Sequence, residues 1–259
     1  MGHRMNQKGM APLIIVAIIV VAVVAGIGIY VITRGGENQP SGGRAHSHDP
    51  IYIQSDDNFT AANGVVGGSG TQSDPYIIEN WAISAENTDG IWIRNTTAYF
   101  IVRNCLMGSR HYNGIYLDNV KNGRIENNTC ENNWYDIVLF SSSYNNLTSN
   151  TCSGINEGID LIFSSYNNLT SNTCENKYWG IHMDNSSYNN LTGNTCENNY
   201  YGIWLYSSSN NNLTNNTCEN DKYGIYLWYS SDNNTMIGNN LLNNSIGPYY
   251  DNGTNNQWS

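Results

Sequence analysis

Basic residues are scarce in this sequence, and their scarcity limits the partners that the chain can have. The 259 residues include 11 Lys and Arg against 21 Asp and Glu, and only 12% of all residues are charged. Arg4, Lys8 and Arg34 flank an apolar segment, so the remainder has 8 basic against 21 acidic residues, a formal charge of −13. A field of this sign repels nucleic acid backbones. We therefore predict no DNA or RNA partner.

Helical periodicity is also missing beyond the N-terminal segment. No stretch after residue 34 places apolar residues at i, i+3, i+4 and i+7, which excludes helical repeats. Short apolar alternations occur instead, separated by Asn, Ser and Gly, which favour turns. No Cys-x-x-Cys spacing of the kind typical of thiolate–metal sites is present.

One long apolar segment stands apart from this pattern. Residues 10–33, "MAPLIIVAIIVVAVVAGIGIYVIT", contain no charge and are long enough to span a membrane. Arg4 and Lys8 precede them, which places the N-terminus inside the cell. We predict a signal anchor over residues 1–34, a flexible linker over 35–49, and a single-pass protein at the cell membrane with its C-terminal domain outside. Alternatively, "KGMAP" resembles the processing site of archaeal pilin-like precursors, with cleavage after Gly9 and a pilin-like or surface-array subunit as the product.

The rest of the chain repeats a phrase of the form Gly-Ile-x-Ile/Leu. The first step is 24 residues and all later steps are 22. The copies begin at Gly90, Gly114, Asp136, Gly158, Gly180, Gly202 and Gly224. Self-similarity at such a period indicates stacked structural repeats. Short strands joined by turns, one coil per repeat, predict an all-β fold, a right-handed parallel β-helix.

Strand alternation predicts which positions, counted from the repeat Gly, face the interior. Positions +1 and +3 are aliphatic or Met in every copy, and position +11 carries Ile or Leu, beginning with Ile101. Position +16 forms a column of buried thiols, namely Cys130, Cys152, Cys174, Cys196 and Cys218. Cys105 is one residue out of register, and we expect Leu106 to take its inward place. One or two disulfides, or a metal site, are the alternatives for this column.

A second column carries asparagine at position +14. Its members are Asn128, Asn150, Asn172, Asn194 and Asn216. An amide can donate to one coil and accept from the next, so we predict a structural ladder at a turn.

Several phrases together resemble a known family. "GVVGGSGTQSDPYIIENWAI" (64–83), "GIWIRNTTAYFIVRNC" (90–105) and the later coils resemble the NosD-like proteins over about residues 50–258. The resemblance implies a right-handed β-helix of the carbohydrate-binding and sugar-hydrolase superfamily, a type found in archaeal surface proteins. Residues 50–89 would then cap the coils of residues 90–259. NosD itself is tied to copper-site maturation, but the sequence shows no copper-ligand cluster, and we predict no metal and no cofactor.

Outward positions carry the candidate functional residues. Aromatic residues at +2 and +4 predict a surface for binding glycans or neighbouring surface proteins, formed by Trp204, Tyr206, Tyr226, Trp228, Tyr116 and Phe140. For an alternative, polysaccharide-processing activity, the candidate catalytic residues are Asp160, His182 and Asp184. Possible glycosylation sites are Asn58, Asn95, Asn146, Asn168, Asn190, Asn212 and Asn252. The interpretation we favour is a membrane-anchored, extracellular binding protein without catalysis.

Overall fold

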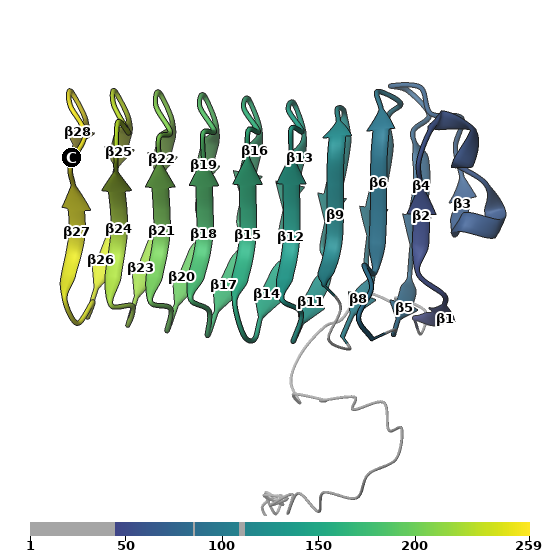
Figure 1. Ribbon diagram of the computed structural model, residues 1–259, viewed down its shortest axis with the longest axis horizontal. Coiled ribbons are helices and arrows are strands. Elements are labelled where there is room, and N and C mark those ends of the chain that lie inside the picture. Colours follow the sequence, from purple (N-terminus) through teal and green to yellow (C-terminus); the bar gives the residue numbers. More distant parts are fainter. Residues whose placement is uncertain (1–44, 85, 109–111) are drawn as a thin grey trace, which may run out of the picture. The chain divides into compact units, whose positions relative to one another are not determined.

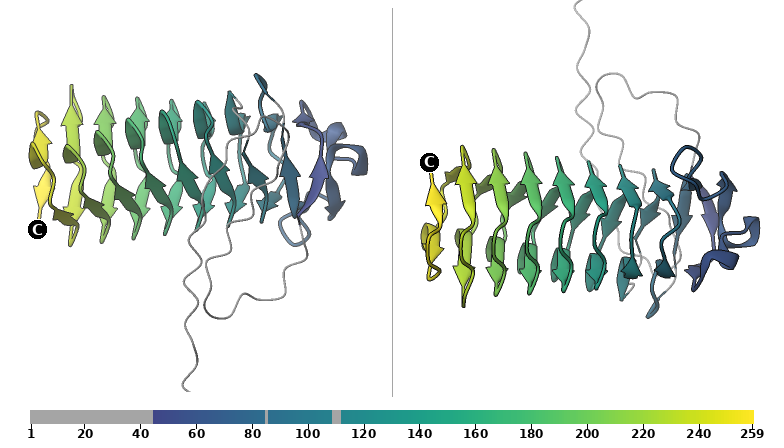
Figure 2. Two further views of the ribbon diagram at one scale, coloured as in Figure 1. Left: turned by 90° about the horizontal axis from the view of Figure 1, so that it is seen from below. Right: turned by 90° about the horizontal axis from the view of Figure 1, so that it is seen from above.

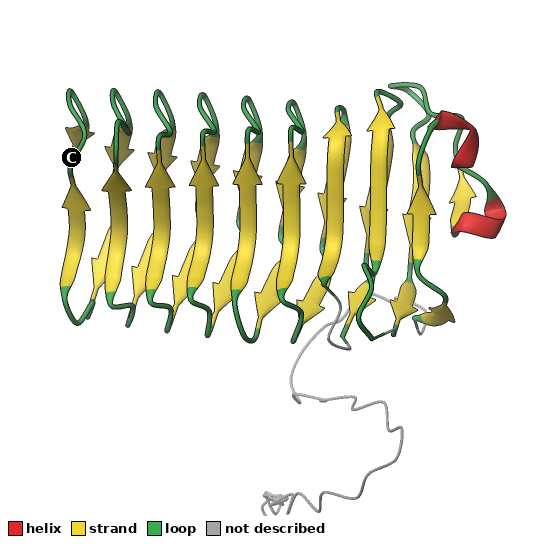
Figure 3. Cartoon of the chain, viewed as in Figure 1, coloured by secondary structure: helices red, strands yellow, loops and turns green. Residues whose placement is uncertain are grey.

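The chain folds as a parallel β-helix, which confirms the predicted all-β solenoid. The structure is a computed structural model that describes residues 45–84, 86–108 and 112–259. Successive coils stack side by side along one axis, and each coil contributes one strand to each of three sheets (Figures 1 and 2). Two short 3-10 helices, η1 (Asp56–Asn58) and η2 (Ala61–Asn63), lie at the end of the stack near the first strands (Figure 3).

The three sheets are named here for the order of their strands within a coil. Sheet 1 contains β2 (Ile51–Ile53), β6 (Ile91–Thr96), β9 (Asn113–Val120), β12 (Tyr135–Phe140), β15 (Glu157–Ile162), β18 (Trp179–Asp184), β21 (Tyr201–Tyr206), β24 (Tyr223–Trp228) and β27 (Gly247–Asp251). Sheet 2 contains β3 (Val65–Gly67), β4 (Tyr76–Glu79), β7 (Phe100–Arg103), β10 (Gly123–Glu126), β13 (Asn146–Thr148), β16 (Asn168–Thr170), β19 (Asn190–Thr192), β22 (Asn212–Thr214), β25 (Thr235–Ile237) and β28 (Gln257–Trp258). Sheet 3 contains β1 (His46–His48), β5 (Trp81–Ile83), β8 (Leu106–Met107), β11 (Thr129–Glu131), β14 (Thr151–Ser153), β17 (Thr173–Glu175), β20 (Thr195–Glu197), β23 (Thr217–Glu219) and β26 (Asn240–Leu242). Within the described ranges every pair is parallel except β3 with β4.

The N-terminal part of the described chain already belongs to the coil. β2, β4 and β5 pair with β6, β7 and β8, so residues expected to cap the helix form a strand in each sheet. β1, within the expected linker, pairs with β5. The predicted anchor at residues 10–33 lies outside the described residues. Among those described, no helix has the length and apolar character that a membrane crossing requires.

Ladders of like side chains fill the interior. The residues at +1 and +3 are fully buried from Ile91 to Leu227, and register pairs Ile137 with Ile115 and Ile159. The five cysteines from Cys130 to Cys218 are buried, unbonded to one another and in register. Such burial is worth about 1.5–3 kcal/mol for each large apolar side chain.

Two expectations for the first full coil were wrong. The +11 column passes through Val102, because Val102 pairs with Ile125, whereas Ile101 pairs with Arg124. In sheet 3 the inward place belongs to Met107, which pairs with Cys130, and Leu106 is exposed. This coil is two residues longer than the 22-residue central coils, and one extra residue before β7 reverses the facing that strand alternation predicts for β7 and β8.

Buried asparagines hold the turn between sheets 2 and 3. Asn150 Nδ2 donates to Asn172 Oδ1 at 2.9 Å, and Asn172 Nδ2 donates to Asn194 Oδ1 at 3.0 Å. Each Oδ1 also accepts from the backbone N–H of the preceding coil, and each Nδ2 also donates to a carbonyl, as Asn172 does to Leu147. The turn between sheets 1 and 2 has two further ladders that sequence reasoning missed. Their members are Ser142, Ser164, Ser186, Ser208 and Ser231, and Asn145, Asn167, Asn189, Asn211 and Asn234.

A buried ion pair lies at the third turn, which joins sheet 3 of one coil to sheet 1 of the next. Lys177 Nζ lies 2.5 Å from Asp136 Oδ2, and neither side chain is exposed. Asp136 stands where other copies have Gly, and Ile155, one coil before Lys177 in the turn, points outward. Burial raises the pKa of Asp136 to about 7 even though Lys177 lowers it. A buried pair of this kind is costly to break because either partner alone would leave an uncompensated charge.

We predict that Asn172→Ala lowers the free energy of unfolding by about 2–4 kcal/mol, because it leaves several buried groups without partners. Asn150 loses the acceptor of both its backbone and side-chain N–H groups, and the Leu147 carbonyl loses a donor. Chemical denaturation measures the change. Asn168→Ala, at an exposed amide, is the matched control and should cost about 0.5 kcal/mol or less. Equal effects of the two changes would contradict a stabilising ladder.

A second prediction concerns Asp221, a buried carboxylate in the third turn, between β23 and β24. Its Oδ1 accepts from Asn199 N and Nδ2, its Oδ2 has no hydrogen-bond partner in the described structure, and burial raises its pKa to about 7. Because the folded-state pKa is raised, the wild type loses stability as pH rises from about 4 through 7. Asp221→Asn removes this loss and supplies an N–H toward the Cys196 carbonyl, as Asn199 does toward Cys174.

We therefore expect Asp221→Asn to gain stability over wild type by about 1–4 kcal/mol at pH 8, and by much less at pH 4. Denaturation midpoints at the two pH values provide the measurement. If the difference in stability between variant and wild type did not change with pH, the raised pKa of Asp221 would be ruled out.

Candidate functional site

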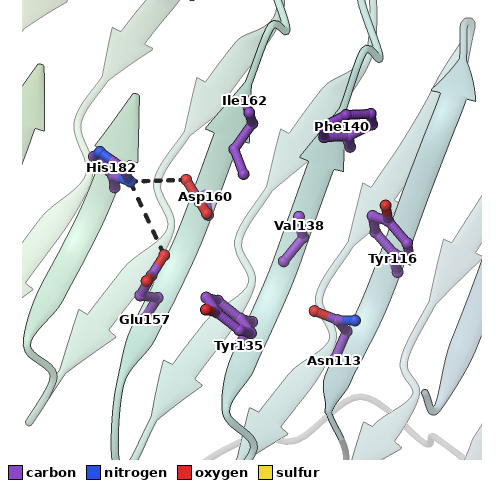
Figure 4. Close-up of a pocket in the computed structure, with 9 residues that line it drawn as sticks. All are labelled: Asn113, Tyr116, Tyr135, Val138, Phe140, Glu157, Asp160, Ile162 and His182. Carbon is purple, nitrogen blue, oxygen red and sulfur yellow. Dashed lines mark ion pairs between the residues drawn. The ribbon is translucent and has the colours of Figure 1, made fainter. Parts of the chain in front are cut away.

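The outer face of sheet 1 carries three columns of side chains that converge on one groove. Positions −1, +2 and +4 of successive coils point outward and lie in register. The groove has a volume of about 390 Å³. Its lining residues are Asn113, Tyr116, Tyr135, Val138, Phe140, Glu157, Asp160, Ile162 and His182 (Figure 4). Val138 lies between Tyr116 and Asp160 in the +2 column. Because its side chain is small, the outer face is hollow at this position.

Three polar side chains meet at one end of the groove. Asp160 is in register with His182 on the next strand, and His182 Nδ1 lies 3.0 Å from Asp160 Oδ1. Glu157, at the start of β15, brings its Oε2 to 4.0 Å from the same nitrogen (Figure 4). Asp160 is 3% exposed, Glu157 6% and His182 9%. These carboxylates are therefore buried, contrary to the usual solvated state of outward acids on a sheet.

Burial and mutual repulsion dominate the electrostatics of this cluster. Loss of hydration raises the pKa of Glu157 well above its ordinary range, and the neighbouring Asp160 carboxylate raises it further. The positive charge of Lys177, inside the solenoid, opposes this shift. Burial and the Asp160 carboxylate therefore both favour the neutral form of Glu157.

Aromatic rings enclose His182 and continue along the sheet. The imidazole stacks on Trp179 and on Trp204, with ring centroids 4.8 Å apart in both cases. Trp204 contacts Tyr206 and Tyr226, and Tyr226 contacts Trp228 and Tyr250. The predicted quartet therefore forms one continuous surface, which we call the aromatic row and define as Trp179, Tyr201, Trp204, Tyr206, Tyr223, Tyr226, Trp228 and Tyr250.

Other predicted residues lie apart from this row. Tyr116, on β9, stacks on Trp92, and Phe140, on the same strand as Val138, contacts Phe163. Asp184 lies at +4 and is not in the cluster; its carboxylate accepts a hydrogen bond from Asn185. Glu157 takes its place, so the expected catalytic trio is only partly assembled.

Sequence reasoning missed Glu157 because the facing of position −1 was not evident. The repeat Gly and the residue at +1 are both buried, so simple alternation fails at the start of each strand. The signal was nevertheless present: position −1 carries Tyr135, Glu157, Trp179, Tyr201 and Tyr223, a series that would be unusual in an interior column.

Four of the possible glycosylation sites lie on the outer face of sheet 2, and the others lie in η1, in β6 and after β27. Asn146, Asn168, Asn190 and Asn212 are exposed in register, as predicted from position +10. Asn168 Nδ2 donates to Asn146 Oδ1, and Asn190 Nδ2 donates to Asn168 Oδ1. Asn95 and Asn252 are exposed and Asn58 is half-buried.

Taken together, the coil and its outer groove define a parallel β-helix protein with a polar cluster beside an aromatic surface. The family described as periplasmic copper-binding protein (NosD) matches residues 73–259, and the chain belongs to that family. A comparison with curated proteins found no match.

Two solved structures have a similar fold. One is the A-module of the Azotobacter vinelandii mannuronan C-5 epimerase AlgE4, with 14% identity and a TM-score of 0.52 over 70% of this chain and 68% of that chain. The other is the periplasmic alginate epimerase AlgG, with 16% identity and a TM-score of 0.57 over 70% of this chain; the match spans half the length of AlgG. At these identities the likeness establishes the fold alone.

Proposed function

We propose that this protein binds an extended, uncharged polysaccharide chain along the outer face of sheet 1. The observation that carries the proposal is the aromatic row, which runs across successive coils and ends at the groove. Trp228 and Tyr250 are each 37% exposed, so their rings are accessible. Flat apolar rings suit the faces of sugars, and an exposed apolar patch marks a contact surface. The fold shared with two epimerases that act on polysaccharides supports a glycan-related role.

Charge favours an uncharged ligand. No lysine or arginine lines the groove, Asp160 and Glu157 stand at its end, and the chain has a net charge of −10. A polyuronate would be repelled by this field, whereas neutral or N-acetylated sugars would meet hydroxyl, amide and aromatic groups. A protein partner on the same surface is the competing possibility.

The binding would take place outside the cell. Residues 10–33 would hold the β-helix at the membrane, as their length and flanking charges predict. In the alternative, the chain is cleaved after Gly9 and serves as a subunit of a surface array.

We predict that Trp204→Ala and Trp228→Ala each weaken binding to a neutral polysaccharide at least tenfold, about 1.4 kcal/mol or more. The full-length chain, purified in a detergent without a sugar headgroup, would be screened on a glycan array and titrated with the best ligand. Trp134→Ala is the matched control, because Trp134 is exposed but lies in a turn outside the aromatic row.

Unchanged affinity in both row variants, with folding intact, would remove the row from the binding site. Binding confined to acidic polysaccharides would overturn the choice of an uncharged ligand. A protein captured through the same two tryptophans, with no glycan bound, would favour the competing partner.

The geometry also bears on catalysis. Hydrolysis of a glycosidic bond uses carboxyl groups about 5–9.5 Å apart that flank the bond. The donor oxygens of Glu157 and Asp160 lie within 4.8 Å of one another, on one side of the groove. We therefore expect no release of reducing ends from any polysaccharide that binds. Reproducible cleavage that disappears in Asp160→Asn would show that the protein is an enzyme.

A further inference from the structure

We propose that Glu157, Asp160 and His182 bind one divalent metal ion of the Zn²⁺ class at the end of the groove. The donor atoms Oε2, Oδ1 and Nδ1 all lie within 4.8 Å of one another. Zn²⁺ binds such donors at about 2.0–2.2 Å, so two ligands of one ion lie no more than about 4.4 Å apart. The observed separations of 3.0 Å and 4.0 Å from His182 Nδ1 already satisfy this limit.

The three donor atoms lack other partners. Each exposes almost no surface to solvent, and none makes a hydrogen bond within the described part of the chain. Buried carboxylates without partners are costly, and the nearby cation, Lys177, is inside the solenoid with Asp136. His182 Nδ1 and Asp160 Oδ1 lie 3.0 Å apart, whereas Glu157 Oε2 lies 4.0 Å from the same nitrogen, beyond hydrogen-bond distance. One metal ion would satisfy all three atoms.

The surroundings favour binding at this place. Trp179 and Trp204 hold the imidazole between them, which limits its rotation before a metal arrives. In Figure 4 the three side chains converge at one end of the groove, with Tyr135 and Val138 on the adjacent strand. Three protein ligands beside an open cavity leave coordination positions free for water or another small ligand.

The donor set also selects the kind of metal. One nitrogen and two carboxylates suit Zn²⁺ or Cu²⁺, whereas Ca²⁺ takes six to eight oxygens. Cu⁺ prefers sulfur, and every cysteine and methionine of the described chain is buried in the core, including Met183 beside His182. The family is described as copper-binding. These three residues suit copper as Cu²⁺ and not as Cu⁺. The proposal does not depend on sugar binding.

Titration of the metal-stripped, full-length chain with Zn²⁺ tests the proposal. We expect one equivalent to bind by calorimetry, with a change in tryptophan fluorescence because Trp179 and Trp204 flank the site. Glu157→Gln and His182→Gln should each weaken binding at least tenfold. Two variants are the controls and should bind as wild type. Asp184→Asn lies on the strand of His182 but outside the cluster, and His48→Gln changes a half-buried histidine of β1, in sheet 3.

Circular dichroism and melting curves establish that each variant is folded, and Glu157→Gln keeps the shape of the side chain if His182→Gln unfolds. The proposal is overturned if one equivalent of Zn²⁺ does not bind, or if binding persists in a folded Glu157→Gln variant. It is equally overturned if Ca²⁺ or Cu⁺ binds where Zn²⁺ does not, because those ions require a different donor set.

Discussion

The structure depends on polar side chains that are buried at the turns and hydrogen-bonded from coil to coil. Asn150, Asn172 and Asn194 each serve the backbone of one coil and the amide of the next. An amide in this position satisfies its partners only if the adjacent coil supplies another amide at the same height. The ladders therefore hold the turns of the 22-residue central coils in register. The aliphatic and cysteine columns then stack because the turns have already set the register.

Uniform register converts single outward residues into columns. Because the inward columns at +1 and +3 recur in the coils from Ile91 to Leu227, residues at −1, +2 and +4 can vary without disturbing the core. Along sheet 1 they change from tyrosine and valine to Glu157, Asp160 and His182, and then to tryptophan and tyrosine. The groove and the polar cluster arise from this change. The third turn is irregular in the same region, since Asp136 and Lys177 form a buried ion pair there and Ile155 points outward. The charge of Lys177 acts on Glu157 through the sheet.

The predictable part of the protein was its regular part. In the central coils the inward columns at +1 and +3 and the Asn172 ladder could be derived because period and strand alternation hold there. The first coil departs from both, and the places assigned to Ile101 and Leu106 were wrong because extra residues in its turns reverse the facing of the strand. Position −1 could not be assigned for a similar reason: the Gly and the residue at +1 both face inward. Glu157 was missed as a result.

By itself, the sequence determined the fold class, the coil length and the outward position of the aromatic residues, because those properties depend on periodicity along one chain. Only the tertiary structure decided which outward residues meet. Asp160 and His182 are 22 residues apart and come into contact because neighbouring strands pair in register, whereas Asp184, equally acidic and closer to His182 in sequence, stays outside the cluster. The burial of the cluster was also a tertiary outcome, because the rings of Trp179 and Trp204 cover an imidazole that strand parity alone would place in water.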